Sequence, residues 1–295
     1  MRVKEYGEKM YNEFRLPEGI SAQIRKVAEL IGSMGKDEFI TSELAETSSY
    51  LLRHPGKMMR PALVFLGAEF AGEKRLDRYV GLAASIELLH TSSLIHDDMI
   101  DKDMERRGME SVHARYGMEA AVLAGDALIS KAIEKAVPYG SEVVSRISSS
   151  AMSMCAGEML DYNFQKKRQT PSLAEYLGMA ELKSSVLIGT SVGIAALHSA
   201  DGIFEQVYNA GVMLGTAFQV RDDILDFRND SRRNHARPNA VVSIAKERGN
   251  GTEDAIAEAV RLNNKYVSGA IEVFEKRHGS MLCKYAKDVA VGPKP

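Results

Sequence analysis

Carboxylates crowd the stretch Ser93–Gly108, SLIHDDMIDKDMERRG, and two arginines follow them directly. In a helix, Asp97 and Asp101 would share one face with their Cβ atoms about 5–6 Å apart, and Asp98 would lie beside them. Like charges at this spacing destabilise a helix, and carboxylates near its C-terminal end oppose the helix dipole. The arrangement is therefore unfavourable unless a cation is bound, and hard carboxylate oxygens suit Mg²⁺.

The same pattern occurs again in the segment FQVRDDILDF, which contains Asp222, Asp223 and Asp226 at the end of a long apolar stretch. One motif alone is commonly a solvated acidic helix end. Two matched motifs make sense if they face each other across one cavity and share divalent ions. Asp103 and Glu105 receive no role.

Basic residues indicate what such ions would help to neutralise. Lys57 and Arg60 in GKMMRP precede an apolar segment, and Pro61 suits the first position of a helix. A helix N-terminus binds anions through its free N–H groups. Arg106 and Arg107 offer the forked donors that match phosphate oxygens.

Further polar and small residues extend this set. Lys183 and Ser184 open another apolar stretch, and Ser92, Ser93 and Leu89 precede the first aspartate motif. Each cation alone is usually a surface charge. Together with two metal-binding motifs, they describe a cavity for two polyanions that carry hydrocarbon tails.

The elements that must hold these residues are helices. Ala, Leu, Met, Glu and Lys dominate, and only eight prolines are present. Arg78–His90 has helical spacing, and Phe204–Phe227 is apolar on most faces, which is typical of a central helix. Glycine and proline breaks divide the chain into about ten helical stretches. We expect one all-α domain over residues 1–295, built around the two long helices.

The composition limits the classes of function. The net charge of −2 argues against a nucleic-acid partner. Cys155 and Cys283 lie far apart, which fits the cytoplasm and gives no sign of a zinc site or a disulfide framework. The charged N-terminus does not resemble a secretory signal. Ser184–Ala200 is an uncharged run of about 17 residues, shorter than the roughly 20 that a membrane span needs. We interpret it as a buried helix and expect no transmembrane segment.

Taken in order, these motifs resemble the trans-type (E-type) polyprenyl diphosphate synthases, the family of farnesyl and geranylgeranyl diphosphate synthases. The resemblance covers about Leu51–Asp226 and rests on GKMMRP, LLHTSSLIHDDMIDKDMERRG, VHARYG, LAGDALIS, AGEMLDY, ELKSSVL and FQVRDDILD. It implies an all-α, isoprenoid-synthase-type helical bundle around a deep central cavity, and a cytoplasmic homodimer.

The resemblance also implies a role for each matching residue. About three Mg²⁺ ions per active site would be held by Asp97, Asp98, Asp101, Asp222, Asp223 and Asp226. The allylic diphosphate would also be bound by Arg106, Lys183, Ser184 and Gln219. The diphosphate of isopentenyl diphosphate would be bound by Lys57, Arg60, His90 and Arg107. His96, which adjoins the first motif, is as consistent with packing as with function.

The implied chemistry explains this inventory. Mg²⁺ and the cations would stabilise the departing diphosphate, and the double bond of isopentenyl diphosphate would attack the allylic cation. An apolar cavity would exclude water from that cation. The reaction is a prenyl transfer of isoprenoid biosynthesis and requires no protein nucleophile.

Product length depends on the helix before Asp97. Farnesyl-producing relatives tend to block the path of the growing chain with aromatic residues four or five positions before the first aspartate. Here those positions are Ser92 and Ser93. The path would be open for about 7 Å, with Leu89, Leu88 or a facing helix as its floor. We expect a product longer than C15, with C20 as first choice and C25 as second.

The chain departs from the family after Asp226. The Gly-Lys element that usually follows is missing, and Arg232, Arg233 or Arg237 could replace its lysine. Two alternatives remain open: a non-catalytic regulatory subunit of a hetero-oligomeric synthase, and a class I terpene cyclase. Both aspartate motifs are intact, which argues against the subunit. The Lys57, Arg60 and Arg107 set argues against the cyclase.

Overall fold

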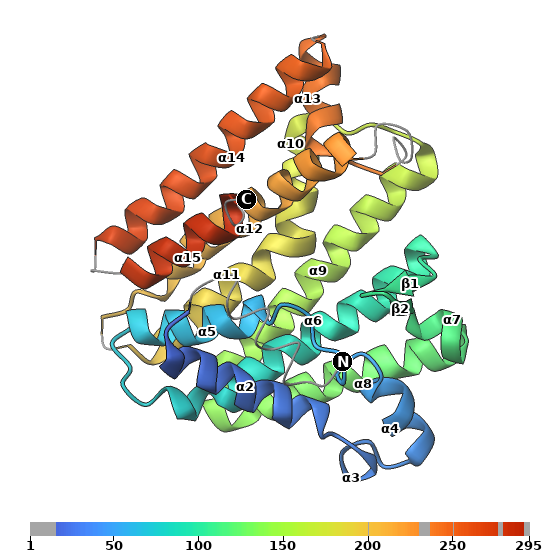
Figure 1. The fold of residues 1–295 in the computed structure, drawn as a ribbon, viewed down its shortest axis with the longest axis vertical. Coiled ribbons are helices and arrows are strands. Elements are labelled where there is room, and N and C mark those ends of the chain that lie inside the picture. Colours follow the sequence, from blue (N-terminus) through green and yellow to red (C-terminus); the bar gives the residue numbers. More distant parts are fainter. Residues whose placement is uncertain (1–15, 200, 230–236, 250, 277–279, 292–295) are drawn as a thin grey trace. The chain divides into compact units, whose positions relative to one another are not determined.

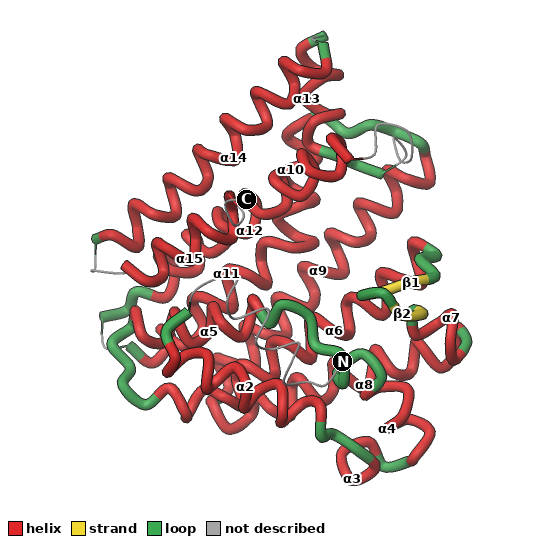
Figure 2. Tube along the Cα trace, in the orientation of Figure 1, coloured by secondary structure: helices red, strands yellow, loops and turns green. Residues whose placement is uncertain are grey.

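Helices make up almost the whole fold. The computed structural model describes residues 16–199, 201–229, 237–249, 251–276 and 280–291, and 81% of it is helical. Within these residues, β1 (Glu105–Arg106) and β2 (Met109–Glu110) form one antiparallel hairpin (Figure 2). The predicted all-α class is confirmed.

The chain forms two compact units, one of residues 1–148 with 194–200 and one of residues 149–193 with 201–295. Each unit contains one of the two long helices predicted from the sequence, α6 (Val80–Asp101) and α12 (Phe204–Asn229). The expectation of one domain over the whole chain is untested.

The first unit holds the N-terminal helices (Figure 1). They are α2 (Glu18–Gly32), α3 (Lys36–Phe39), α4 (Ser42–Ser49), α5 (Met59–Phe70), α6, α7 (Val112–Tyr116) and α8 (Met118–Ala136), with 3₁₀ turns at η1 (Leu76–Tyr79), η2 (Val137–Tyr139) and η4 (Ile194–His198). The long helix α6 packs mainly against α8, with α2 and α5 also in contact. Residues 82–89 of α6 are all buried, so this helix forms the core of the unit.

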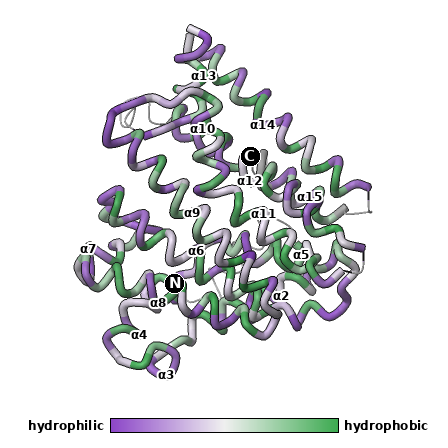
Figure 3. The backbone as a smooth tube through the Cα atoms, turned by 180° about the vertical axis from the view of Figure 1, so that it is seen from behind, coloured by the Kyte–Doolittle hydropathy of each residue, from purple (hydrophilic) through white to green (hydrophobic). Residues whose placement is uncertain are grey.

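The second unit holds the C-terminal helices. They are α10 (Leu173–Ala180), the π-helical turn η3 (Glu181–Ser185), α11 (Val186–Gly193), α12, α13 (Ala240–Arg248), α14 (Thr252–Glu275) and α15 (Ser280–Val291). The helix α9 (Ser141–Lys167) begins in the first unit and continues in the second. Hydrophobic and hydrophilic residues alternate along α14 (Figure 3), and the buried ones, such as Ala255, Ala259 and Ala270, lie on one face.

Glycines allow α12 to approach α11 closely. A Cβ atom at Gly211 would lie 2.8 Å from the Cα of Gly189, and one at Gly215 would lie 2.6 Å from the Cα of Ser185. Both distances are too short for any side chain. The pattern G-x-x-x-G in this helix therefore permits close backbone contacts of α12 with α11 and η3.

One apolar stretch, Leu173–His198, meets the length and hydropathy criteria of a membrane span, but 72% of its apolar window is buried inside the structure. This burial agrees with the core helix predicted over Ser184–Ala200. The short helices α3 and α7 were not predicted, because four or five residues are too few to show a helical period.

Candidate active site

The first aspartate motif occupies the last turn of α6, as predicted. The helix ends at Asp101, and Lys102 follows in the left-handed conformation with φ of 59°. Asp98 is fully buried, and its Oδ1 accepts a hydrogen bond from Arg106 Nε at 2.8 Å. Its buried Oδ2 has no hydrogen-bond partner within the described residues. Burial raises the pKa of Asp98, and the Arg106 guanidinium opposes that rise.

A tight hairpin directs the two arginines after this motif. Arg106 lies on β1, while Arg107 (φ 57°) and Gly108 (φ 75°) form the turn. Two positive φ angles are typical of two-residue hairpin turns. Arg106 faces Asp98, whereas Arg107 Nη1 donates to the carbonyl of His54 at 2.7 Å. The hairpin was not predicted, although glycine directly after Arg107 is a signal for such a turn.

Arg60 and His90 form a second cationic group in the same unit. Arg60 Nη1 donates to His90 Nε2 at 3.0 Å, so the ring proton lies on Nδ1. Burial, together with Arg60 and Arg107, lowers the pKa of His90 well below its ordinary value. The imidazole is therefore a neutral acceptor near neutral pH. Lys57 is exposed just before α5.

The start of α5 corrects one prediction. The helix begins at Met59, so Pro61 is its third residue rather than its first, and Met58 precedes it in the left-handed conformation. Arg60 therefore lies inside the first turn. Gly56 lies against Arg107: a Cβ atom at this position would lie 2.7 Å from Arg107 Nη2, so a larger residue would displace the guanidinium.

Glu87 is a buried carboxyl group that the sequence analysis left without a role. It lies on α6 one turn before His90 and is 2% exposed. Burial raises its pKa, and Arg107 and Arg60 oppose the rise. The sequence signal for this residue is a glutamate within an apolar helical segment. Glutamate is rarely buried without a charged partner, so its position there indicates cations nearby.

The second aspartate motif lies near the end of α12, also as predicted. Asp223 is 6% exposed, and its Oδ2 accepts from the backbone N–H of Ala240 at 2.6 Å. Its Oδ1 accepts from Gln219 Nε2 at 3.2 Å. Burial raises the pKa of Asp223 to about 6. Asp222 is half-buried and Asp226 is exposed.

Ser184 and Gln219 adjoin this motif. Ser184 Oγ donates to Gln219 Oε1 at 3.3 Å, which connects η3 through Gln219 to Asp223. Tyr176 is buried in the same region, and burial together with the Asp223 charge raises its pKa well above the ordinary value. The structure thus brings together three of the predicted site residues.

Lys183 is held by two carboxylates of α9. Its Nζ lies 2.5 Å from Asp161 Oδ2 and 2.7 Å from Glu158 Oε2. Gly157 brings α9 against the π-helical turn, because a Cβ atom there would overlap the backbone of Lys183. The segment AGEMLDY was noticed in the sequence, but its acidic residues were not assigned to this lysine.

The residues predicted to control product length lie in the packed part of α6. Leu89 is 3% and Ser92 is 1% exposed. Ser93 is half-buried, and its hydroxyl donates to the carbonyl of His90 at 2.8 Å. The Ser92 hydroxyl oxygen is buried without a hydrogen-bond partner in the described part of the chain.

His96 has a packing role. Its ring fills the space over Gly125 of α8, where a Cβ atom would overlap the imidazole. Its Nε2 also lies 3.7 Å from Asp126 Oδ1. These contacts join α6 to α8, which favours the structural interpretation of this histidine.

The carboxylates fit a hard cation without forming a complete site by themselves. Among the described residues, no three His, Cys, Asp or Glu side chains are grouped closely enough to hold a metal ion. Mg²⁺ usually takes one or two carboxylates, waters and substrate phosphate oxygens. The unpartnered Oδ2 of Asp98, with Asp97 and Asp101 on the same helix end, matches that requirement.

Two sequence predictions are not decided by these contacts. The aspartate motifs belong to different units, so their sharing of one cavity is untested. Arg232 and Arg233 lie outside the described residues, whereas Arg237 is described and precedes α13.

An all-α fold that carries an aspartate motif at the end of each of two long helices defines an isoprenoid-synthase-type protein. The chain belongs to the polyprenyl synthetase family, whose sequence model it matches over residues 41–237. This family membership confirms the resemblance inferred from the motifs.

Named relatives agree with this assignment. The short chain isoprenyl diphosphate synthase of Methanothermobacter thermautotrophicus is 32% identical over 91% of this chain and 87% of that protein. The geranylgeranyl diphosphate synthase of Methanosarcina mazei is 38% identical, but the match spans only 62% of this chain and 59% of that protein. A geranylfarnesyl diphosphate synthase of Natronomonas pharaonis is 35% identical over 60% of its length.

Solved structures show the same fold. A geranylgeranyl pyrophosphate synthetase from Geoglobus acetivorans superposes with a TM-score of 0.81 and 26% identity, covering 90% of this chain and 99% of that one. A heptaprenyl diphosphate synthase from Staphylococcus aureus also gives a TM-score of 0.81, with 23% identity.

Proposed function

We propose that the chain is a Mg²⁺-dependent trans-prenyltransferase that condenses isopentenyl diphosphate with allylic diphosphates. The observation that carries the proposal is the pair formed by the buried Asp98 and the half-buried Arg106. One Asp98 oxygen accepts from the guanidinium, and the other is buried without a partner. A carboxylate suited to a cation and an arginine suited to a diphosphate therefore lie at one place in a chain of this family.

The proposed ligands of Mg²⁺ are the six aspartates of the two motifs: Asp97, Asp98, Asp101, Asp222, Asp223 and Asp226. When bound, Mg²⁺ supplies positive charge that stabilises the departing diphosphate. The allylic diphosphate is assigned to Arg106, Lys183, Ser184 and Gln219. The diphosphate of isopentenyl diphosphate is assigned to Lys57, Arg60, His90 and Arg107.

Carboxylates position two of the cations for this role. Arg106 is held by Asp98, and Lys183 is held by Asp161 and Glu158. A bound diphosphate would take over donors that already have an orientation, so less reorganisation is needed when negative charge develops. Neutral His90 acts similarly, because its acceptor nitrogen holds one Arg60 N–H and so orients the guanidinium.

We propose a product longer than C15, with C20 as first choice and C25 as second. Relatives named geranylgeranyl and geranylfarnesyl diphosphate synthases support this range. The small side chains of Ser92 and Ser93 also support it, because farnesyl-producing relatives tend to carry aromatic side chains at these positions.

We also propose that the chain acts as one catalytic domain and as a cytoplasmic homodimer. The family model runs through both units, which supports the single domain. Met118, Val122 and Leu123 of α8 are between 42% and 61% exposed, and exposed apolar side chains on one helix suit an interface.

An elongation assay tests the function. The purified chain is incubated with Mg²⁺, isopentenyl diphosphate and each of the C5, C10, C15 and C20 allylic diphosphates, and the products are sized. We expect elongation that stops at C20 or C25 and disappears with EDTA. No elongation from any primer would contradict the proposal and favour the regulatory subunit. Cyclised hydrocarbon made without isopentenyl diphosphate would favour the terpene cyclase.

A further inference from the structure

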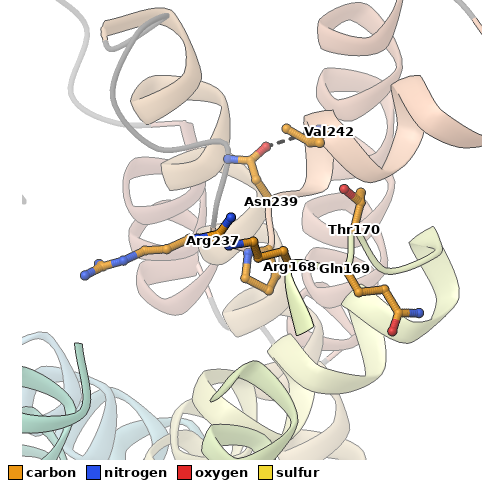
Figure 4. A pocket seen from close by; sticks show the side chains of 7 residues that line it. Arg168, Gln169, Thr170, Arg237, Asn239 and Val242 are labelled. Carbon is orange, nitrogen blue, oxygen red and sulfur yellow. Dashed lines mark hydrogen bonds between the residues drawn. The ribbon is translucent and has the colours of Figure 1, made fainter. Parts of the chain in front are cut away.

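A pocket in the second unit lies outside the residues assigned to either substrate (Figure 4). Its volume is about 370 Å³, near the small end of the range of about 300–1,000 Å³ that is typical of ligand pockets. The side chains that matter for its chemistry are Arg168, Gln169, Thr170, Arg237, Asn239 and Val242.

The end of α9 forms one wall of this pocket. Arg168 follows the helix with φ of 50°, a left-handed conformation that is unfavourable for a residue with a side chain. Its N–H donates to the carbonyl of Gln165 at 3.0 Å, and the N–H of Gln169 donates to that of Phe164 at 2.9 Å. These bonds end the helix and turn Arg168–Thr170 toward the pocket.

Ionic side chains of α13 hold this loop in place. Lys246 Nζ donates to the carbonyl of Thr170 at 2.6 Å, and the N–H of Leu173 donates to Glu247 Oε1 at 2.7 Å. The wall is therefore fixed at its base, while Arg168 itself is exposed.

The opposite wall is the segment that supports the second aspartate motif. Asn239 Oδ1 accepts from the N–H groups of Val241 and Val242, and so caps α13. Its Nδ2 donates to the carbonyl of Asp223 at 3.2 Å, and the next residue, Ala240, donates to the Asp223 carboxylate. The pocket thus adjoins Asp223 through Asn239 without including that carboxylate.

The charges in the pocket have one sign. Two arginines line it, and no carboxylate does among the described residues. Glu175 of α10 and Glu247 of α13 accept from the N–H groups of Ser172 and Leu173. Planar guanidinium groups match phosphate oxygens, and amide and hydroxyl donors can complete the contacts.

We propose that this pocket binds a diphosphate group through Arg168 and Arg237, separately from the metal-dependent site. The choice of diphosphate over other anions rests on the proposed function. The group can come from two sources: inorganic diphosphate released by the transfer, or the head group of a prenyl diphosphate.

Metal-free binding tests the proposal independently of elongation. The full chain is titrated with inorganic diphosphate in EDTA by calorimetry, and hydrogen exchange locates the site. We expect protection of residues 168–173 and 239–242. Arg168→Gln and Arg237→Gln should each weaken binding at these residues at least about tenfold. Lys167→Gln is the matched control, because Lys167 is an exposed neighbouring cation that does not line the pocket, and it should bind as the wild type does.

A second titration with geranyl diphosphate separates the two sources. Tighter binding than inorganic diphosphate identifies a prenyl head group, and equal or weaker binding identifies the free ion. Absence of protection at both segments would overturn the proposal, as would equal losses in Lys167→Gln and the two pocket variants. Failed elongation with intact metal-free binding would contradict only the proposed function. Arg168→Lys, which keeps the charge, should retain part of the affinity.

Discussion

The two aspartate motifs are alike in sequence but are held by different means. In the first, the buried carboxylate of Asp98 faces the guanidinium of Arg106. In the second, the buried carboxylate of Asp223 faces neutral donors, the N–H of Ala240 and the amide of Gln219. Burial raises the pKa of both, and that of Asp223 reaches about 6. The buried carboxylate of this motif can therefore be stabilised either by a cation or by dipoles.

The largest expected effect tests whether the two motifs are equivalent in function. Asp97→Ala and Asp222→Ala should each lower elongation at least about a hundredfold, because each removes negative charge assigned to Mg²⁺. The steady-state rate with isopentenyl diphosphate and an allylic primer measures this. Glu105→Ala is the control, since Glu105 is exposed on β1 and has no assigned role. Full activity of either aspartate variant would show that the motifs do not share the metal ions.

The next effect tests the difference between the motifs. Arg106→Gln should lower the free energy of unfolding by about 2–3 kcal/mol, because it leaves Asp98 buried without its cation. Gln219→Leu should cost about 1 kcal/mol, since Asp223 keeps the N–H of Ala240. Urea unfolding in EDTA compares the two. Equal losses would mean that the ionic partner contributes no more than the neutral one.

A change in product length would extend the comparison to α6. Ser92→Phe should shorten the product by at least one C5 unit, because the aromatic ring would fill space beside a residue that is 1% exposed. Ser92→Ala removes only the hydroxyl and should leave the length unchanged. The measurement is the chain length of the products made by each variant and by the wild type. An unchanged distribution in Ser92→Phe would place the length-determining wall elsewhere.

The smallest expected effect is a pH dependence of stability caused by Glu87, which lies on the same helix as Asp98. Its raised pKa means that the folded state holds the proton more tightly than the unfolded state. Stability from this group is therefore present below its ordinary pKa of 4.5 and is lost as the pH rises through the raised value. Glu87→Gln should flatten that dependence in urea unfolding measured across pH. A wild-type curve as flat as the variant's would show that Arg60 and Arg107 fully offset the burial.

Much of the fold could be predicted because its signals are local and long. The 26 residues of α12 form a long segment that is apolar on most faces, and Pro138, Gly202 and Gly249 mark real breaks. The acidic motifs were placed correctly at helix ends for the same reason. The tertiary partners could not be predicted, because Asp161 and Lys183 meet only through the packing of α9 on η3.

The pocket beside Asp223 shows the same limit. Arg168 and Arg237 lie far apart in the sequence, and no spacing rule connects them. Their proximity depends on a left-handed residue after α9 and on the cap of α13. Contacts of this kind become visible only when the helices are assembled.

The hairpin of β1 and β2 has a consequence for insertions and deletions. Successive residues of a strand point to opposite sides, so a shift of one position exchanges the sides of all of them. Arg106 and Arg107 therefore owe their different partners, Asp98 and the carbonyl of His54, to the two-residue turn. One residue removed between Lys102 and Arg106 would present the wrong arginine, Arg107, to Asp98 while leaving the composition of the loop almost unchanged. In this segment, the contact with Asp98 depends on the number of residues before the arginine and not only on the charges present.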